Sequence, residues 1–266
     1  MLGPLEVRIN GASIVPSAGK PRQLLALLAL RAGQVVQIPT LMEEAWGSQI
    51  PKSSQTTLQT YILQLRRRIT AALPVGAKQS AKEILSTQFG SYRLTGPVDC
   101  CDLLTFRRMA AEGSSALDAG DDLRAAEVLA RALALWRGPA LADVPVGRVL
   151  ETEILGMDEL RTRTLELRIE ADLRLGRHAE ILAELRMLAA QHPLHENFCA
   201  QLMIALHRSG RTWRALEAYQ RLRDTLVSEL GVEPSTRLQR LHQLVLGGTP
   251  EPMDPANWGL PVRLPY

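Results

Sequence analysis

The chain has 266 residues, 46% hydrophobic content and a formal charge of +3, so it is long enough for two domains with buried cores. It has no apolar run near the roughly 20 residues that cross a bilayer, and no signal-peptide pattern at its N-terminus. Its three cysteines, Cys100, Cys101 and Cys199, are too few and too poorly spaced for a disulfide framework. We therefore expect a cytoplasmic protein with reduced thiols and no membrane partner.

Charge is distributed unevenly along the chain. Residues 1–96 contain eleven basic and four acidic side chains, a formal charge of +7, whereas residues 97–266 carry −4. A basic first module joined to a mildly acidic remainder indicates that the first module meets a polyanion. The alternative is chance clustering of basic residues.

The first 96 residues alternate between strand and helix patterns. In chain order they predict a strand over 5–9 turning at Asn10-Gly11, a helix from Lys20 to near Gly33, a strand over 35–38, a helix over 39–46, a loop from Gly47 to Ser53, a helix over 54–72, and strands at 84–87 and 92–94 joined through Phe89-Gly90. Strands, three helices and a terminal hairpin are the plan of a winged helix-turn-helix, whose hairpin wing would lie against the minor groove or the backbone of DNA.

From Asp99 onward the regular patterns are helical. The predicted helices cover residues 102–119, 121–136, 148–175, 177–191, 195–209, 211–230 and 234–246. Glycines at 176 and 210 lie 34 residues apart, the period of tetratricopeptide helix pairs. The sequence predicts a mainly α protein with a DNA-binding domain over 1–96, a helical domain over 97–247 and a flexible Pro/Gly-rich tail over 248–266.

The helix predicted from Ser54 has two contrasting faces. Its apolar face, formed by Leu58, Ile62, Leu65 and Ile69, is expected to pack on the core. The opposite face carries Thr56, Thr60, Leu63, Gln64 and Arg67, whose hydroxyl, amide, methyl and guanidinium groups suit base edges in a major groove. Arg66 and Arg68 point to the flanks, toward phosphates. A solvated face whose arginines complement the helix dipole is the alternative.

Several longer blocks of the sequence resemble those of a known protein family. The runs KPRQLLALLALRAGQVVQIPTLMEEAWG and TTLQTYILQLRRRI resemble the OmpR-type winged helix of the Streptomyces antibiotic regulatory proteins. ALWRGPALAD, ELRTRTLELRIEADLRLGRHAEILAEL, QLMIALHRSGR and SELGVEPSTRLQRLH resemble the bacterial transcriptional activation domain that accompanies it. The resemblance covers about residues 2–246. It implies a nucleoid-associated activator of an antibiotic gene cluster. Such an activator binds direct repeats near the promoter −35 region as a head-to-tail pair of protomers, and recruits RNA polymerase through its sigma and alpha subunits.

The same resemblance implies roles for particular residues. On the recognition helix it assigns base-reading positions to Thr57, Gln59, Thr60, Gln64 and Arg67, and backbone contacts to Tyr61, Arg66 and Arg68. The loop from Gly47 to Ser53, with Ser48, Gln49 and Lys52, resembles a polymerase-contacting segment; a plain connector is the alternative. Lys20 and Arg22 are expected near phosphates or as solvated caps.

The wing departs from the family pattern. Members commonly have Thr-Arg-Pro-Pro-Gly-Tyr, whereas this chain has Thr87-Gln88-Phe89-Gly90-Ser91-Tyr92. Because Gln88 replaces the arginine, no charged insertion into a narrow minor groove is expected from that position. Weaker wing contacts are expected from Gln88 and Tyr92, or from Arg93 or Lys82.

Motifs for catalysis and cofactors are missing from the sequence. No Gly-x-x-x-x-Gly-Lys-Ser/Thr loop, Gly-x-Ser-x-Gly elbow or zinc-protease motif occurs, so no enzymatic activity and no cofactor are expected. His192, His195 and Cys199 have spacings that could seat a metal, but a fourth ligand is missing, so no metal is expected. The alternative to a DNA-binding activator is a helical-repeat adaptor that binds a protein partner, with Trp136, Trp213 and Tyr219 on its surface or, more often, in its core.

Overall fold

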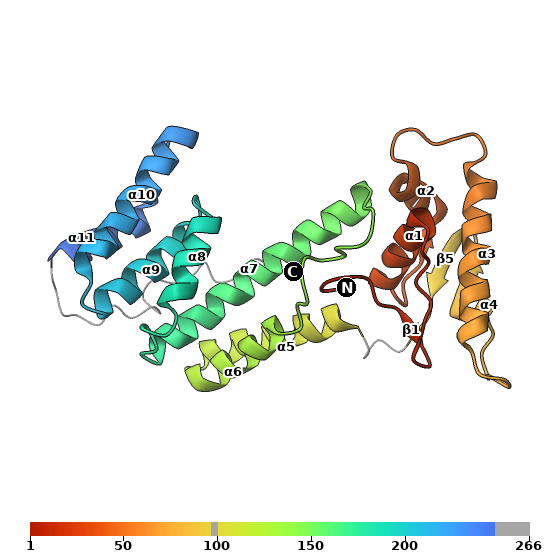
Figure 1. The fold of residues 1–266 in the computed structure, drawn as a ribbon, viewed down its shortest axis with the longest axis horizontal. Coiled ribbons are helices and arrows are strands. Elements are labelled where there is room, and N and C mark those ends of the chain that lie inside the picture. The colour runs from red at the N-terminus through yellow and green to blue at the C-terminus, as the bar shows by residue number, and fades with distance from the viewer. Residues whose placement is uncertain (97–100, 248–266) are drawn as a thin grey trace. The chain divides into compact units, whose positions relative to one another are not determined.

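The computed structural model describes residues 1–96 and 101–247 (Figure 1). The chain forms two compact units. Unit 1 comprises Met1–Met109 and Arg131–Thr162, and unit 2 comprises Ala110–Ala130 and the chain from Arg163 onward. None of the described helices is long and apolar enough to cross a membrane. The predicted flexible tail over 248–266 and the Cys100 thiol lie outside the described residues.

Unit 1 contains the predicted strands, helices and hairpin. In chain order its elements are β1 (Arg8–Ile9), β2 (Ala12–Ser13), α1 (Gly19–Leu30), β3 (Val36–Gln37), α2 (Ile38–Trp46), α3 (Ser54–Ala72), α4 (Ala81–Ile84), β4 (Leu85–Gln88) and β5 (Ser91–Leu94). α3 has the predicted bounds. α4 was not predicted: Ser80 and Glu83 form a capping box that winds one helical turn directly before the predicted strand, which begins at Leu85 instead of Ile84.

The strands form two small antiparallel sheets. β1 pairs with β2 through a turn in which Asn10 and Gly11 have φ of 48° and 80°, as the Asn-Gly signal predicted. In the second sheet β5 lies between β3 and β4, with Val36 opposite Tyr92 and Leu85 opposite Leu94. The β4–β5 hairpin is the wing of a winged helix, and α3 holds the position of the recognition helix in that fold.

The core of unit 1 includes residues from beyond the winged helix. Leu58, Ile62 and Leu65 of α3 pack in one apolar cluster with Leu141 and Leu150. The Glu44 carboxylate, 1% exposed, accepts hydrogen bonds from Gln23 Nε2 (2.6 Å) and from the backbone N–H groups of Gly147 (2.6 Å) and Leu150 (2.9 Å). It thereby satisfies N–H groups at the start of α7 (Arg148–Arg174), which have no partner inside the helix.

The regular elements of unit 2 are all helices among its described residues. α5 (Asp102–Asp118), α6 (Asp122–Leu133) and α7 each run from one unit into the other along the chain, and α8 (Leu182–Gln191), α9 (Glu196–Arg208), α10 (Thr212–Leu230) and α11 (Thr236–Gly247) complete it. α8 begins five residues later than predicted, because 177–181 form turns after Gly176, whose φ is 77°.

Three buried acidic residues lie on the part of α7 that belongs to unit 2. Glu166, Glu170 and Asp172 on α7 are each at most 8% exposed. Arg174 pairs with Glu170 and, at 3.5 Å, with Asp122, and it also donates to Leu117 O (3.2 Å). Burial raises the pKa of Glu170, against the hydrogen bond and charge of Arg174. The arginines of α7 therefore hold buried carboxylates and stabilise the helical packing.

Candidate nucleic-acid interface

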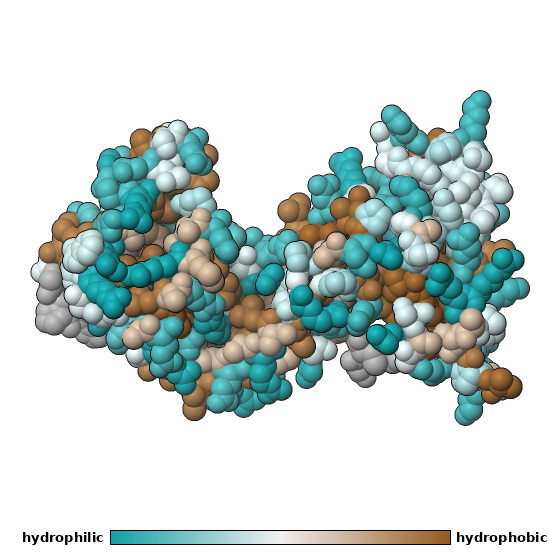
Figure 2. Space-filling view, viewed as in Figure 1, coloured by the Kyte–Doolittle hydropathy of each residue, from teal (hydrophilic) through white to brown (hydrophobic). Residues whose placement is uncertain are grey.

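α3 is divided into a buried and an exposed face at the positions that its periodicity predicts. Leu58, Ile62, Leu65 and Ile69 are at most 1% exposed. The exposed residues of this helix that were predicted to contact DNA are Thr56, Gln59, Thr60, Leu63, Gln64, Arg67 and Arg68, and Leu63 is 49% exposed. Figure 2 shows a mostly hydrophilic and neutral surface over α3, at the right of the view. From Thr56 to Arg68, the exposed face offers donors, acceptors and one aliphatic side chain over roughly three and a half turns of helix.

Some polar groups of this face form hydrogen bonds within the chain, and others do not. Thr57 and Thr60 hydroxyls donate to the carbonyls of Ser53 and Thr56, each at 3.0 Å, so each oxygen remains an acceptor. Within the described chain, no hydrogen bond or ion pair engages the guanidinium of Arg67. Tyr61 is half-buried, because its ring stacks on Trp46 of α2 with centroids 6.3 Å apart.

Arg66 connects the recognition helix to the wing. Its Nε and Nη2 donate to Leu85 O at 3.0 and 2.8 Å, and Nη2 also donates to Thr87 Oγ1 at 2.8 Å. This side chain was predicted to contact phosphate; in the structure two of its three nitrogens bond to β4 and position it. Arg68 Nη1 donates to Val15 O at 3.3 Å, at the opposite flank of α3.

The tip of the wing carries a feature that sequence reasoning missed. Phe89 is fully exposed, at 108% of its reference area, and its φ is 33°, in the left-handed region. Gly90 beside it has φ of 73°. An exposed aromatic ring and a left-handed backbone at a bulky residue both cost free energy. The signal was present in the sequence, because Phe89 stands where a hairpin turn favours Asn, Asp or Gly.

Three residues predicted near DNA lie elsewhere or are already bonded. Tyr92 is 5% exposed and belongs to the apolar cluster of unit 1. The Lys20 ammonium donates to Ala45 O near the C-terminal end of α2, where unpaired carbonyls attract cations. Arg22 donates to Pro16 O (2.9 Å) and pairs with Asp143 at 3.3 Å. These side chains contribute to packing and to helix ends in unit 1.

The remaining wing residues are more accessible. Lys82 is exposed, and Gln88 and Arg93 are half-buried. Glu83, which is exposed, accepts a hydrogen bond from Ser80 N (2.6 Å), and this bond lowers its pKa. The carboxylate nearest the wing in the sequence is thus engaged in capping α4.

The loop between α2 and α3 is exposed along its length. Gly47, whose φ is 59°, ends α2, and every residue from Gly47 to Ser53 is exposed, including Ser48, Gln49 and Lys52. Ile50 is 49% exposed. In Figure 1 this loop is the segment that joins α2 to α3.

These features define a class of protein. Two family models match the chain: the C-terminal domain of transcriptional regulatory proteins over residues 14–94, and the bacterial transcriptional activator domain over residues 101–246. An OmpR-type winged helix followed by this helical activator domain is the architecture of a DNA-binding transcriptional regulator.

Comparison with individual proteins places the chain more narrowly. It is 53% identical to regulatory protein DnrI of Streptomyces peucetius, over 94% of this chain and 92% of DnrI, and 36% identical to transcriptional regulator RedD of Streptomyces coelicolor, over 98% and 76%. A solved structure of Mycobacterium tuberculosis EmbR in complex with a low-affinity phosphopeptide matches with a TM-score of 0.85 and 30% identity, covering 94% of this chain and 64% of that one. The chain belongs to the Streptomyces antibiotic regulatory protein family of transcriptional regulators.

Proposed function

We propose that this protein is a cytoplasmic, sequence-specific activator of an antibiotic or other secondary-metabolite gene cluster, without enzymatic activity. The observation that carries the proposal is the exposed polar face of α3, on which the Arg67 guanidinium is unpaired within the described chain while the opposite face is buried. Base edges in a major groove supply the acceptors that such a face needs. Family membership supports the regulatory role.

The proposed base-reading residues are on the exposed face, with phosphate-contacting residues at its edges. Thr56, Thr57, Gln59, Thr60, Leu63, Gln64 and Arg67 are proposed to read bases, and Tyr61, Arg66, Arg68, Lys82 and Arg93 to contact the backbone. Lys20, Arg22 and Tyr92 are left out of this set, because their side chains are engaged within unit 1. Gln64 and Arg67 are the residues for which we expect the largest loss of specificity.

Phe89 is proposed as the contact at the wing tip. Apolar side chains inserted at a minor-groove base step unstack it partly and favour flexible steps. A phenyl ring supplies this kind of contact without the arginine that Gln88 replaces. Arg66 supports the proposal, because it ties the base of the hairpin to the recognition helix.

Polymerase recruitment is proposed for the exposed loop from Gly47 to Ser53, with the sigma and alpha subunits as partners. Its exposed Ile50 and Lys52 support this role, since an apolar and a basic side chain are both available to a protein surface. We further propose that two protomers bind direct repeats head to tail. The proposed domains are residues 1–96 for DNA binding and 97–247 for activation, with 248–266 as a tail.

Footprinting on the promoters of neighbouring genes, with and without RNA polymerase, tests the proposal. We expect protection of two direct repeats near the −35 region, and a stronger polymerase footprint when the protein is present. A mobility shift at graded salt should give a specificity ratio over random DNA of at least about a thousandfold. Equal affinity for all sequences would reject specific DNA binding.

A further inference from the structure

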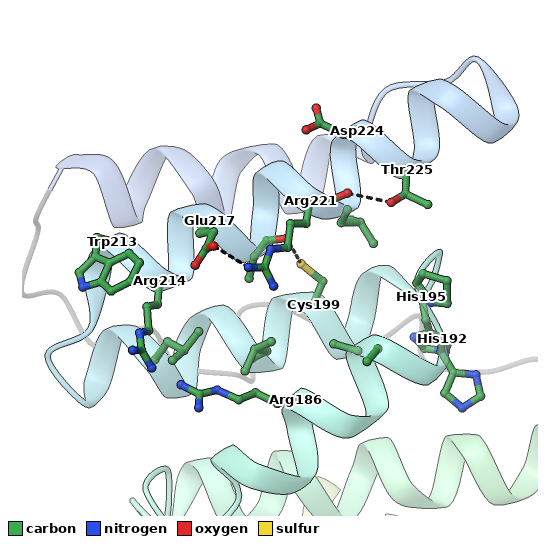
Figure 3. A pocket seen from close by; sticks show the side chains of 17 residues that line it. Arg186, His192, His195, Cys199, Trp213, Arg214, Glu217, Arg221, Asp224 and Thr225 are labelled. Carbon is green, nitrogen blue, oxygen red and sulfur yellow. Dashed lines mark hydrogen bonds and ion pairs between the residues drawn. The ribbon is translucent and has the colours of Figure 1, made fainter.

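Unit 2 contains a groove between α8, α9 and α10 that the DNA-binding role does not use (Figure 3). Its volume is about 820 Å³. The floor is apolar, formed by Leu202 and Leu206 of α9 and Leu222 of α10, which are 2–6% exposed. A groove of this size with an apolar floor is suited to a ligand that brings its own large apolar side chain.

A tryptophan stands at one end of the groove. Trp213, in the first turn of α10, is 64% exposed, and the Arg214 guanidinium lies 5.0 Å from its ring centroid. Tryptophan and arginine are the residue types most enriched among those that dominate binding free energy at protein interfaces. An exposed indole that packs on no core gains free energy when a partner covers it.

The charges that line the groove are unequally satisfied. Glu217 pairs with Arg221 at 2.5 Å, and Asp224 accepts a hydrogen bond from Gln220 at 2.8 Å, both within α10. Arg186 of α8 and Arg214 of α10 line the same groove, and neither has a carboxylate partner among the residues that the structure describes. In Figure 3 both guanidinium groups lie at the end of the groove where Trp213 is drawn. The charged groups of the groove that lack a partner are therefore positive, and a negatively charged ligand would pair with them.

The other end of the groove offers no site for chemistry. Burial raises the pKa of the Cys199 thiol to about 12, so this sulfur stays protonated and behaves as an apolar group. The His195 ring stacks on Phe198 with centroids 4.3 Å apart. No cluster of three potential metal ligands occurs in the described parts of the chain. The groove is thus built for binding by packing and charge.

We propose that this groove binds an acidic peptide segment of a partner protein. A large apolar side chain of the peptide packs on Trp213 and the leucine floor, while its carboxylates pair with Arg186 and Arg214. The inference does not depend on DNA binding, because the groove lies within unit 2 and shares no residue with the proposed DNA contacts.

The test is selection of peptides from a random 12-residue phage library on the full chain, followed by affinity measurements with the selected synthetic peptides. We expect selected peptides to combine two or more carboxylates with an aromatic or large aliphatic residue. Affinity should fall at least about tenfold for Trp213→Ala and for the double variant Arg186→Ala/Arg214→Ala, since two charge-assisted contacts are lost. Replacing Glu by Gln in the peptide should give a loss similar to that of the double variant.

The control is Arg240→Ala, which removes an exposed arginine outside the groove and should leave peptide affinity unchanged. Circular dichroism melting verifies that each variant folds. The proposal is overturned if selection yields no peptide that depends on Trp213, or if neutral or basic peptides are selected. Displacement of a selected peptide by a synthetic peptide of residues 248–266 would also overturn it, because the groove would then belong to the chain's own C-terminal segment.

Discussion

Arg67 on α3 and Arg174 on α7 are the same residue type on two helices, in opposite circumstances. Arg174 is bonded to Glu170, Asp122 and the carbonyl of Leu117, all within unit 2. Arg67 is exposed and has no bonded partner in the described chain. The contrast teaches that an arginine's role is set by its partners: a paired one maintains the fold, and an unpaired one on an ordered face is available to a ligand.

Removing the paired arginine should have the largest effect. Arg174→Ala leaves the Glu170 carboxylate buried without its cation, so we expect the free energy of unfolding to fall by about 3 kcal/mol. Specific DNA affinity of the folded protein should stay the same. Urea unfolding measures the free energy of unfolding, and a mobility shift measures the DNA affinity. Arg131→Ala, which removes an exposed arginine of α6, should change stability by less than about 0.5 kcal/mol. Equal effects of the two variants would contradict the contrast.

Removing the unpaired arginine, Arg67, should weaken DNA binding and leave stability nearly unchanged. Arg67→Ala is expected to weaken operator binding by about 1–3 kcal/mol, because a base contact is lost. The free energy of unfolding should change by less than about 0.5 kcal/mol. Arg240→Ala removes the same charge from α11 and serves as the control in both measurements. An Arg67 variant that binds operator DNA normally would remove this residue from the interface.

A substitution at the wing tip should change stability and DNA affinity in opposite directions. Phe89→Asn places a residue that tolerates positive φ at a φ of 33°, so stability should rise by about 0.5–1 kcal/mol. Operator affinity should fall about fivefold, or roughly 1 kcal/mol, because the apolar contact is lost.

The salt dependence of that variant supplies the control. An apolar contact releases no counterions, so the slope of log K against log salt should match the wild type. In Lys82→Ala the slope should instead become shallower if Lys82 contacts phosphate, as proposed. Normal affinity of Phe89→Asn together with a stable fold would reject the wing-tip contact while leaving the α3 interface untouched.

The smallest expected effect concerns the pH dependence of unit 2. Because burial raises the pKa of Glu170 above its ordinary value of 4.5, the folded protein binds a proton there more tightly than the unfolded chain. Stability from this group is full below pH 4.5 and is lost as the pH rises through the raised pKa. Glu170→Gln should lose less stability over that range, measured by urea unfolding between pH 4 and 7. If the stability of the variant and of the wild type changed equally with pH, this expectation would be wrong. Glu127→Gln, at an exposed position of α6, is the control.

Periodicity was sufficient for the bounds of α3 and for its two faces, but not for α4 or for the start of α8. Leu58, Ile62, Leu65 and Ile69 repeat at the spacing of one helix face, and burial of that face leaves Gln64 and Arg67 exposed whatever the rest of the chain does. The turn at Asn10-Gly11 was equally local, because its positive φ values favour those residues.

The tertiary structure alone decided which polar groups have partners. Arg66 and Arg67 are adjacent and chemically identical, yet Leu85 and Thr87, about 20 positions away, bond only Arg66. Glu44 and Gly147 likewise meet across more than a hundred residues. A side chain's own sequence neighbours fix the direction in which it leaves the backbone. The groups it then meets come from distant segments, whose approach depends on the packing of the whole unit.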